Sequence, residues 1–396
     1  MSKKTIALLL AALMIVSVVA AGCSKSGGSG GTTEKKPMVL HWNLGEEPPG
    51  LDSVLTTDQV SFEVLNALQD GLVRQQENQP ATKGSGLAKD WTVSSDGMTY
   101  TFTLRDAKWS DGQPITAKDF AFAWKRAMNP KTAAEYSYQF AYIKGFDALS
   151  AIDVKAADAD QKIAEALKTV GVTAKDDKTL EVTLAAPTPY FLSLMSFPTF
   201  LPQRQDIVEK YGDKYASDPD KMVYSGPFVL SEWTHESKMV WDKNPNYWDK
   251  DNVKLDQINM TMIKDINTPV NMYEAGELDV INVPAEFLDQ YKSKGVVKTR
   301  ADSTTWYIEF NNKDKVFKNA NMRKALSLAI DRQSFVDNIL KNGSIPALAY
   351  TPPSISGDKG AFHPLVGDIL APKADQAAAK AALEAGLKEL GLTKAP

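Results

Sequence analysis

The sequence predicts a mixed α/β fold, of the α+β kind, with more than one domain. Some short segments alternate between apolar and polar residues, as strands with one buried face do. Other segments repeat apolar residues every three or four positions, as helices on a core do. The two kinds mix without a strict strand–helix–strand order, which favours α+β or mixed α/β lobes. With 396 residues, 43% hydrophobic and 24% charged, the chain suffices for two or three domains.

Two elements open the folded region. Residues 38–42 predict a strand, which the Pro/Gly-rich turn at residues 47–50 ends. Residues 61–68 predict a helix, because their apolar side chains recur every third position and share one face.

The clearest local pattern follows these elements. Residues 91–93 and 100–104 predict two strands joined by a turn at residues 94–97. In the second strand, aromatic and aliphatic residues alternate with threonines, so one face is expected to be buried. Thr116 and Asp119 form a capping box at the start of a helix that carries a large apolar residue at every fourth position.

The remaining elements are predicted from the same two patterns. Strands are expected at residues 180–184, 225–230, 238–241, 258–263 and 304–310, the second pairing with the third. Helices are expected at residues 268–275, 321–340 and 374–390, the last with Leu383, Leu387 and Leu390 on one face and Gly391 as its end. Between these elements, the Pro- and Phe-rich residues 187–202 predict a buried, irregular crossover.

The composition excludes several kinds of site. Lys and Arg number 45 against 49 Asp and Glu, for a net charge of −4, and no basic block suggests a nucleic-acid surface. A single cysteine excludes an intramolecular disulfide and a Cys-clustered zinc site. His41, His235 and His363 lie far apart in the sequence, so no local histidine motif binds a metal. We therefore expect no metal and no cofactor.

The amino terminus predicts export from the cytoplasm. Lys3 and Lys4 precede an apolar run at residues 6–21, which is shorter than the roughly 20 residues of a membrane span and is typical of a signal peptide. Small residues lead into Cys23, in a pattern that resembles a bacterial lipobox. The Gly/Ser-rich residues 24–36 then form a flexible tether. The alternative is a free thiol after a plain signal peptide.

Several motifs carry a resemblance to a known family. They are Leu87-Ala88, Trp91, Asp96-Gly97, Tyr100-Thr101-Phe102, Leu104-Arg105, Trp109-Ser110-Asp111-Gly112, Pro114, Thr116-Ala117, Asp119-Phe120, Ser225-Gly226-Pro227-Phe228, Asn244-Pro245-Asn246-Tyr247-Trp248, Gly276-Glu277-Leu278-Asp279, Met322–Leu326, Ile330-Asp331-Arg332 and Thr351-Pro352-Pro353. Together they resemble the large extracytoplasmic solute-binding proteins of peptide and nickel ABC importers, best the oligopeptide-binding branch. The resemblance covers nearly everything after Met38.

The resemblance implies two lobes that close about a hinge on a ligand. It implies the following division: a signal peptide (1–22), a lipidated cysteine with its tether (23–37), a first lobe (38–69 with 202–301), an accessory domain (70–201) and the start of a second lobe (302–396). Members of the family continue past this point, so we expect a truncated chain with an incomplete second lobe. The carboxylate that pairs with the peptide's amino terminus would lie in the missing region.

The resemblance also implies ligand-binding residues. It places Thr57, Asp58 and Gln59 along the peptide backbone, Tyr136 in a side-chain pocket, and Asn282 and Tyr307 at other ligand-facing positions. The alternatives are plain: Asp58 is a solvated loop carboxylate, and Tyr136 belongs to the core. No catalytic residue is assigned.

The sequence thus favours a monomeric lipoprotein that captures oligopeptides on the outer face of the cell membrane and delivers them to an ABC permease. The same fold with another ligand stays open: a nickel complex, haem, an oligosaccharide, or a cell-wall or signalling peptide. A secreted hydrolase also stays open, because carboxylate pairs are too numerous to exclude a glycosidase. Against a hydrolase, there is no H-E-x-x-H motif, and the one G-x-S-x-G pattern, at residues 27–31, lies in the tether rather than between a strand and a helix.

Overall fold

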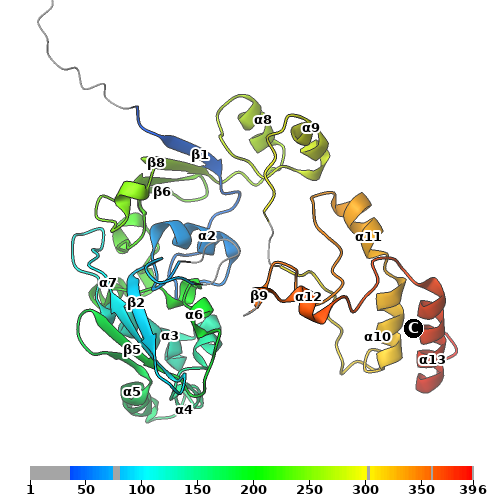
Figure 1. The fold of residues 1–396 in the computed structure, drawn as a ribbon, viewed down its shortest axis with the longest axis horizontal. Coiled ribbons are helices and arrows are strands. Elements are labelled where there is room, and N and C mark those ends of the chain that lie inside the picture. The colour runs from blue at the N-terminus through cyan, green and yellow to red at the C-terminus, as the bar shows by residue number, and fades with distance from the viewer. Residues whose placement is uncertain (1–35, 75–80, 301–303, 358–359, 395–396) are drawn as a thin grey trace, which may run out of the picture. The chain divides into compact units, whose positions relative to one another are not determined.

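The computed structural model describes residues 36–74, 81–300, 304–357 and 360–394, so the predicted signal peptide and Cys23 lie outside the described residues (Figure 1). The strands are β1 (Val39–Asn43), β2 (Ala88–Val93), β3 (Thr99–Leu104), β4 (Val172–Ala174), β5 (Thr179–Thr183), β6 (Phe228–Thr234), β7 (Lys238–Lys243), β8 (Gln257–Thr261), β9 (Ser356–Gly357) and β10 (Gly360–Ala361). The α-helices are α2 (Gln59–Leu68), α3 (Ala117–Met128), α4 (Phe146–Ser150), α5 (Ala159–Thr169), α6 (Phe191–Leu194), α7 (Gln205–Tyr211), α8 (Thr268–Glu274), α9 (Leu288–Ser293), α10 (Ala320–Ala329), α11 (Arg332–Ser334), α12 (His363–Val366) and α13 (Gln376–Leu390).

Two four-stranded sheets confirm the predicted mixed α/β fold. One sheet has the order β1-β8-β7-β6, in which β1 runs parallel to β8 and the other neighbours are antiparallel. The second sheet has the order β2-β3-β5-β4 and is antiparallel throughout. The pairing of β6 with β7 confirms the hairpin that the sequence predicts. β9 and β10 form a separate two-stranded ribbon.

The first hydrophobic core, which we call the Trp124 cluster, packs α3 against the second sheet (Figure 1). Its buried side chains come from residues 72–200, with Val54 added. The apolar residues of β3 are buried and its threonines are half-buried, as the alternation predicts. α3 begins at the predicted capping box, where the Thr116 N–H donates to the Asp119 carboxylate at 2.7 Å.

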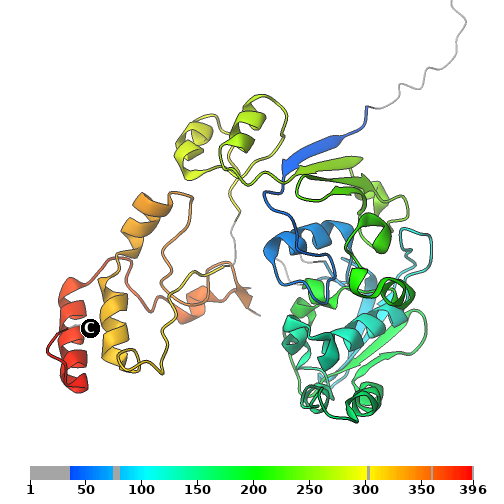
Figure 2. The ribbon, with the colours of Figure 1, turned by 180° about the vertical axis from the view of Figure 1, so that it is seen from behind.

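The second core, the Trp241 cluster, has buried side chains from residues 44–68 and 201–262. Here α2 packs next to β6, and its Val64, Leu65 and Leu68 are fully buried. Apolar burial contributes about 1.5–3 kcal/mol for each such side chain, so one helix face fixes α2 to the sheet. Figure 2 shows α2, in blue, from the reverse side.

A buried polar junction joins the two clusters where the chain passes between them. The Gln69 side chain accepts from the Ser225 N–H (3.1 Å) and hydroxyl (2.8 Å), and the Asp70 N–H donates to the same hydroxyl (2.8 Å). The Gly226 N–H donates to the Leu68 carbonyl at 3.0 Å. We call these residues the Gln69–Ser225 junction. Its contacts leave no room for a side chain at Gly226.

Charged groups surround the junction. The fully buried Asp70 carboxylate accepts from the Trp248 indole (2.7 Å) and the Tyr247 hydroxyl (3.3 Å), and it faces the Arg74 guanidinium (3.4 Å). Burial raises the pKa of Asp70, while Arg74 and these hydrogen bonds oppose that shift. The Arg105 guanidinium lies 3.4 Å from the centre of the Trp248 ring, within cation–π distance.

A second buried link ties α3 to the other cluster. Arg126 of α3 donates from both guanidinium nitrogens to the Asp52 carboxylate, at 2.8 and 2.6 Å. Gln203 donates to the same carboxylate at 2.9 Å and accepts from Arg126 at 3.0 Å. Because every partner is paired, this buried bidentate ion pair avoids the cost of an isolated charge.

Three loops meet at His235 in the turn between β6 and β7. One ring nitrogen contacts the Glu47 carboxylate and the other lies 3.3 Å from Asp218. Glu47 also accepts from the Trp233 indole at 3.1 Å and from the Glu236 N–H. The hydrogen bond to Glu47, with a further one to Asp218, raises the pKa of His235 above its usual value.

The region after residue 304 packs most closely where α10 meets α13, and both views show these helices side by side (Figure 1 and Figure 2). The three leucines predicted to share one face of this helix are half-buried in α13, while Ala379, Ala382 and Gly386 are its buried residues. A Cβ on Gly386 would lie 2.7 Å from the Met322 sulfur, so the helices approach through small residues. Gly391 ends α13 with φ 68°, as predicted.

Two predictions in this region are wrong. Residues 304–310 lie outside every strand of the described chain, and Trp306 is 89% exposed, so this segment does not bury the apolar face that the prediction required. The single helix predicted over residues 321–340 is broken, because Ile330 adopts extended angles (φ −87°, ψ 119°). The Asp331 carboxylate then accepts from the Ser334 N–H at 2.7 Å and starts a new turn, an alternative that short acidic side chains offer the backbone.

We expect Gly226→Ala to destabilise the protein. A Cβ at Gly226 would lie 2.6 Å from the Gln69 nitrogen and from the Leu68 carbonyl carbon, and neither backbone atom can move freely. The free energy of unfolding, measured with urea, should fall by about 1–3 kcal/mol or more. Gly50→Ala is the matched control, because a Cβ there meets nothing within 4 Å. Equal stability of the two variants would contradict the close approach.

We expect His235 to make stability depend on pH. Its pKa is raised on folding, so its stabilising contribution is fully present below the unfolded value of about 6.5 and disappears as pH rises through the folded-state pKa. His235→Gln should lower the free energy of unfolding by under about 1 kcal/mol at acid pH, because the ring is half-exposed, and by less at alkaline pH. Urea titrations at the two pH values measure this. A loss that is the same at both would rule out the charged pair.

Candidate functional site

Thr57, Asp58 and Gln59 form the amino-terminal end of α2. Asp58 is the N-cap residue: its carboxylate accepts from the Ser61 N–H at 2.8 Å and from the Ser61 hydroxyl at 2.7 Å. Thr57 and Gln59 are exposed and Asp58 is half-buried. The Asp58 carboxylate is therefore occupied by the helix cap. What this segment leaves exposed is Thr57, Gln59 and its main chain.

Tyr136 lies in a 3₁₀ turn at Glu135–Phe140 and is half-buried. Its ring packs 4.9 Å from the Phe197 ring and 5.9 Å from the Phe62 ring, measured between centroids. Burial raises the pKa of Tyr136, so the hydroxyl stays protonated and can donate a hydrogen bond. Because Phe62 lies in the first turns of α2, one aromatic group joins Tyr136 to the helix that Asp58 caps.

The ring partners of Tyr136 are not among the ligand-binding residues that the sequence predicts. Phe62 and Phe197 pack edge to face at 5.2 Å, and Tyr138 lies 5.9 Å from Tyr136 with 58% of its surface exposed. Tyr138 is the aromatic residue two positions after Tyr136, which is a weak signal in the sequence. Phe62 and Phe197 have no local signal, since tertiary packing alone brings them to Tyr136.

Asn282 and Tyr307 lie in other surroundings. Asn282 is exposed and lies two residues after Val280, which forms an isolated parallel bridge with Trp42 of β1. Tyr307 is 61% exposed, and its ring packs 5.5 Å from the Tyr350 ring. The structure thus packs Tyr136 on Phe62 of the helix that Asp58 caps, and it gives Asn282 and Tyr307 separate surroundings.

α2 also carries one titratable group with a shifted pKa. Glu63 is half-buried, and desolvation raises its pKa while the Arg300 charge opposes the shift. Glu63 follows Phe62 directly on α2, and side chains at consecutive helix positions point to different faces, so Glu63 is not part of the aromatic group.

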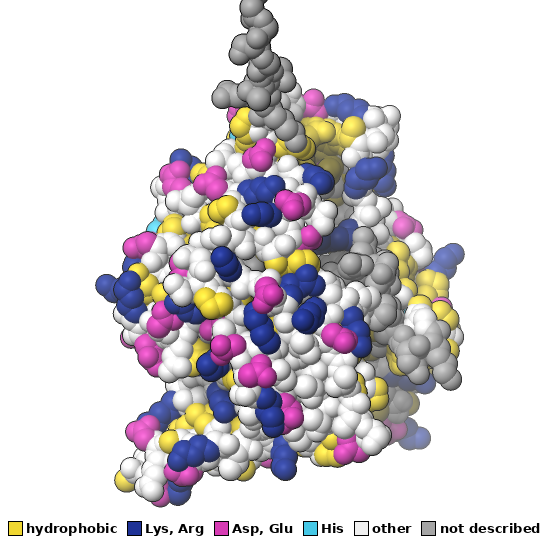
Figure 3. All heavy atoms as spheres, turned by 60° about the vertical axis from the view of Figure 1, so that its left-hand side comes forward, with side chains coloured by type: hydrophobic (Ala, Val, Ile, Leu, Met, Phe, Trp, Pro, Cys, Tyr) yellow, Lys and Arg dark blue, Asp and Glu magenta, His cyan; other side chains and the backbone are white. Residues whose placement is uncertain are grey.

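The described residues offer no cluster of three or more His, Cys, Asp and Glu that could hold a metal ion. Two histidines face carboxylates: His235 as described, and His363, whose ring lies 3.0 Å from Asp368. No helix within residues 36–394 that the structure describes is both long and apolar enough to cross a membrane. On the face in Figure 3, basic and acidic side chains are interspersed, in keeping with the absence of a basic block from the sequence.

Comparisons with known proteins match nearly the whole folded region. The family described as bacterial extracellular solute-binding proteins, family 5 (Middle), matches residues 84–395. The dipeptide-binding protein DppE of Bacillus subtilis is 38% identical over 363 residues, and the oligopeptide-binding protein OppA of the same organism is 38% identical over 362 residues. Each alignment covers 90% of this chain.

A solved structure agrees with these relatives. Listeria monocytogenes OppA bound to peptide is 38% identical and superimposes with a TM-score of 0.75, covering 91% of this chain and 70% of that one. The chain spans 63% of the length of each Bacillus relative. The mixed α/β architecture with its two sheets therefore matches that of oligopeptide-binding proteins.

Proposed function

Because the chain belongs to the bacterial extracellular solute-binding proteins of family 5, we propose that it captures oligopeptides outside the cell and delivers them to an ABC importer without catalysing a reaction. The observation that carries this proposal is the 38% identity to relatives named for dipeptide and oligopeptide binding, over 90% of the chain. The Listeria structure that it resembles holds a peptide.

The chemistry of the candidate site supports backbone recognition. A receptor for many peptides must bind the main chain that they share, through hydrogen bonds worth about 1 kcal/mol each. The Asp58 carboxylate is occupied by Ser61, so Thr57–Gln59 would contribute main-chain groups rather than a charge. Tyr136, supported by Phe62 and Phe197, would form one wall of a side-chain pocket. Asn282 and Tyr307 would add contacts from their own segments.

The two hydrophobic clusters support the proposed division of the chain. The Trp241 cluster draws on residues 44–68 and 201–262, which matches a first lobe made of 38–69 and 202–301. The Trp124 cluster draws mainly on residues 72–200, which matches an accessory domain at 70–201. Residues from 302 onward would begin the second lobe.

The proposed location is the outer face of the cell membrane. The relatives in this family are extracellular solute-binding proteins, which supports a position outside the cytoplasm. Lipidation of Cys23 would anchor the protein, and the residues that follow it would keep the folded body within reach of the permease subunits. The proposed receptor acts as a monomer.

Peptide binding tests the proposed function. In calorimetry on the protein expressed from its natural gene, short peptides of different composition should bind with affinities within about tenfold, or roughly 1.4 kcal/mol. The reason is that the shared backbone, rather than any one side chain, supplies most contacts. Tight binding of one sugar or metal chelate without any peptide, or cleavage of the peptides, would overturn the proposal.

Variants of Tyr136 test its role in the same measurement. Tyr136→Ala should weaken peptide binding by about tenfold, since it removes a ring that packs on Phe62 and Phe197, while Tyr136→Phe should lose less. Tyr273→Ala is the control, because that ring belongs to α8 and packs on Tyr291 of α9 rather than on the Tyr136 group. Circular dichroism checks that each variant is folded. Unchanged affinity in a folded Tyr136→Ala protein would assign the ring to the core alone.

Cys23→Ala tests the lipid anchor. Each buried methylene of a lipid chain contributes about 0.8 kcal/mol, and a stable anchor needs more than one chain. Because the thiol of Cys23 is the proposed attachment point, its removal should release the protein from the membrane fraction. Mass spectrometry should also show that the acyl mass is lost. If the variant keeps both its membrane association and its mass, Cys23 is not the attachment site.

A further inference from the structure

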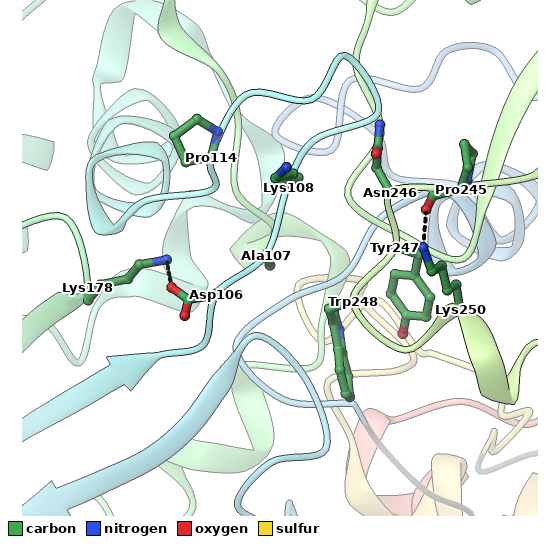
Figure 4. A pocket seen from close by; sticks show the side chains of 10 residues that line it. All are labelled: Asp106, Ala107, Lys108, Pro114, Lys178, Pro245, Asn246, Tyr247, Trp248 and Lys250. Atoms are coloured by element: carbon green, nitrogen blue, oxygen red, sulfur yellow. Dashed lines mark hydrogen bonds and ion pairs between the residues drawn. The ribbon is translucent and has the colours of Figure 1, made fainter.

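A cavity of about 540 Å³ lies outside the candidate peptide site, and none of Thr57–Gln59 and Tyr136 lines it. Three segments form its walls: residues 106–114 after β3, the turn between β4 and β5, and residues 245–250 after β7 (Figure 4). Two of the family motifs, Trp109–Gly112 and Asn244–Trp248, belong to these segments. The volume is in the range of small-molecule sites.

The charge of the cavity is predominantly positive. Lys108, Lys178 and Lys250 line it, and Asp106 is the one carboxylate among the lining residues. Lys178 donates to the Arg105 carbonyl and contacts Asp106, both at 3.1 Å, so the single carboxylate is already paired. Lys250 donates to the Pro245 carbonyl at 3.1 Å, which orients the ammonium group without neutralising its charge.

Figure 4 shows the three lysines around the cavity, with Lys178 on one side, Lys250 on the opposite side and Lys108 between them. Among the ion pairs that the structure gives for its described residues, none involves Lys108 or Lys250. Their charges therefore lack a carboxylate partner among the residues that the structure describes. An anion in the cavity would interact favourably with both, and with the donors that Lys178 has left.

The walls of the cavity are fixed before any ligand binds. Trp248 is held by its hydrogen bond to Asp70 at 2.7 Å and by the Arg105 guanidinium stacked on its ring. Asn246 donates to the Ser110 carbonyl at 2.9 Å, which ties one wall to another. These contacts hold Trp248 and Asn246 in place, so the ordering cost of binding falls on the lysine side chains.

We propose that this cavity binds a phosphate-bearing anion with an organic group attached. A phosphate carries up to two charges and accepts from several ammonium groups at once, and lysine binds it as a point charge. The volume exceeds that of a bare ion, and Trp248, Pro114 and Pro245 supply apolar surface for the remaining group. A soluble phosphate ester and a phospholipid headgroup share this chemistry. The proposal is independent of peptide binding.

Calorimetric titration of the protein with glycerol 3-phosphate, at low and at high salt, tests the site. Binding should saturate and should weaken as salt rises, because the site is open to solvent. A protein with Lys108→Gln, Lys178→Gln and Lys250→Gln should bind about tenfold more weakly, as the loss of three exposed charge contacts implies. A control protein should bind normally. It loses the same charge at three exposed positions elsewhere, through Lys155→Gln, Lys264→Gln and Lys313→Gln.

Two further arms identify the source of the phosphate. Vesicles of phosphatidylglycerol, compared with vesicles of phosphatidylcholine, should bind the protein through the three lysines if the ligand is a headgroup. Saturable binding of glycerol 3-phosphate without vesicle binding would identify a soluble ester. Circular dichroism confirms that both triple variants are folded. If neither probe binds, or if both triple variants lose binding equally, the cavity is not an anion site.

Discussion

The close approach of the chain to itself at the Gln69–Ser225 junction is the constraint on which the rest of the fold depends. Gly226 lies against the Leu68 and Gln69 backbone, and Ser225 shares its hydroxyl between Gln69 and Asp70. Each of these polar groups is buried, so an unpaired partner would cost about 1–3 kcal/mol. The junction therefore fixes the Trp124 and Trp241 clusters to one another with little freedom to slide.

The family motifs gain a physical meaning from this arrangement. The Ser110 N–H donates to the Tyr224 carbonyl at 2.8 Å, and Asn246 donates back to the Ser110 carbonyl. Asn244 donates to the Gly226 carbonyl at 2.9 Å. Motifs far apart in the sequence thus meet at a single buried location. Their residue types are required by packing and hydrogen bonding there, and they lie apart from the residues proposed to contact peptide.

Patterns among neighbouring residues predicted most elements of the fold correctly. The predictions failed where a competing cap or contacts between distant parts of the chain decide the structure. The capping box of α3 and the alternation in β3 are properties of neighbouring residues, so the sequence alone was sufficient. The break at Ile330 depends on a competing cap at Asp331, which periodicity does not register. Residues 304–310 keep the composition of a strand but lie outside every strand of the described chain, so their pattern was not sufficient. At the candidate site, Phe62 and Tyr136 meet only through folding, so their contact had no signature in the sequence.

The discontinuity of the Trp241 cluster affects the order in which the protein can fold. β1 pairs with β8, and Met38 contacts Asp256, 218 residues later, so this sheet is complete only when most of the chain is available. The Trp124 cluster draws almost entirely on one continuous stretch and can form earlier. Once folded, that stretch holds Leu68 near Leu201, which shortens the loop that β1 and β8 must close and lowers its entropic cost. The inserted region is then a folding scaffold for the sheet that flanks it.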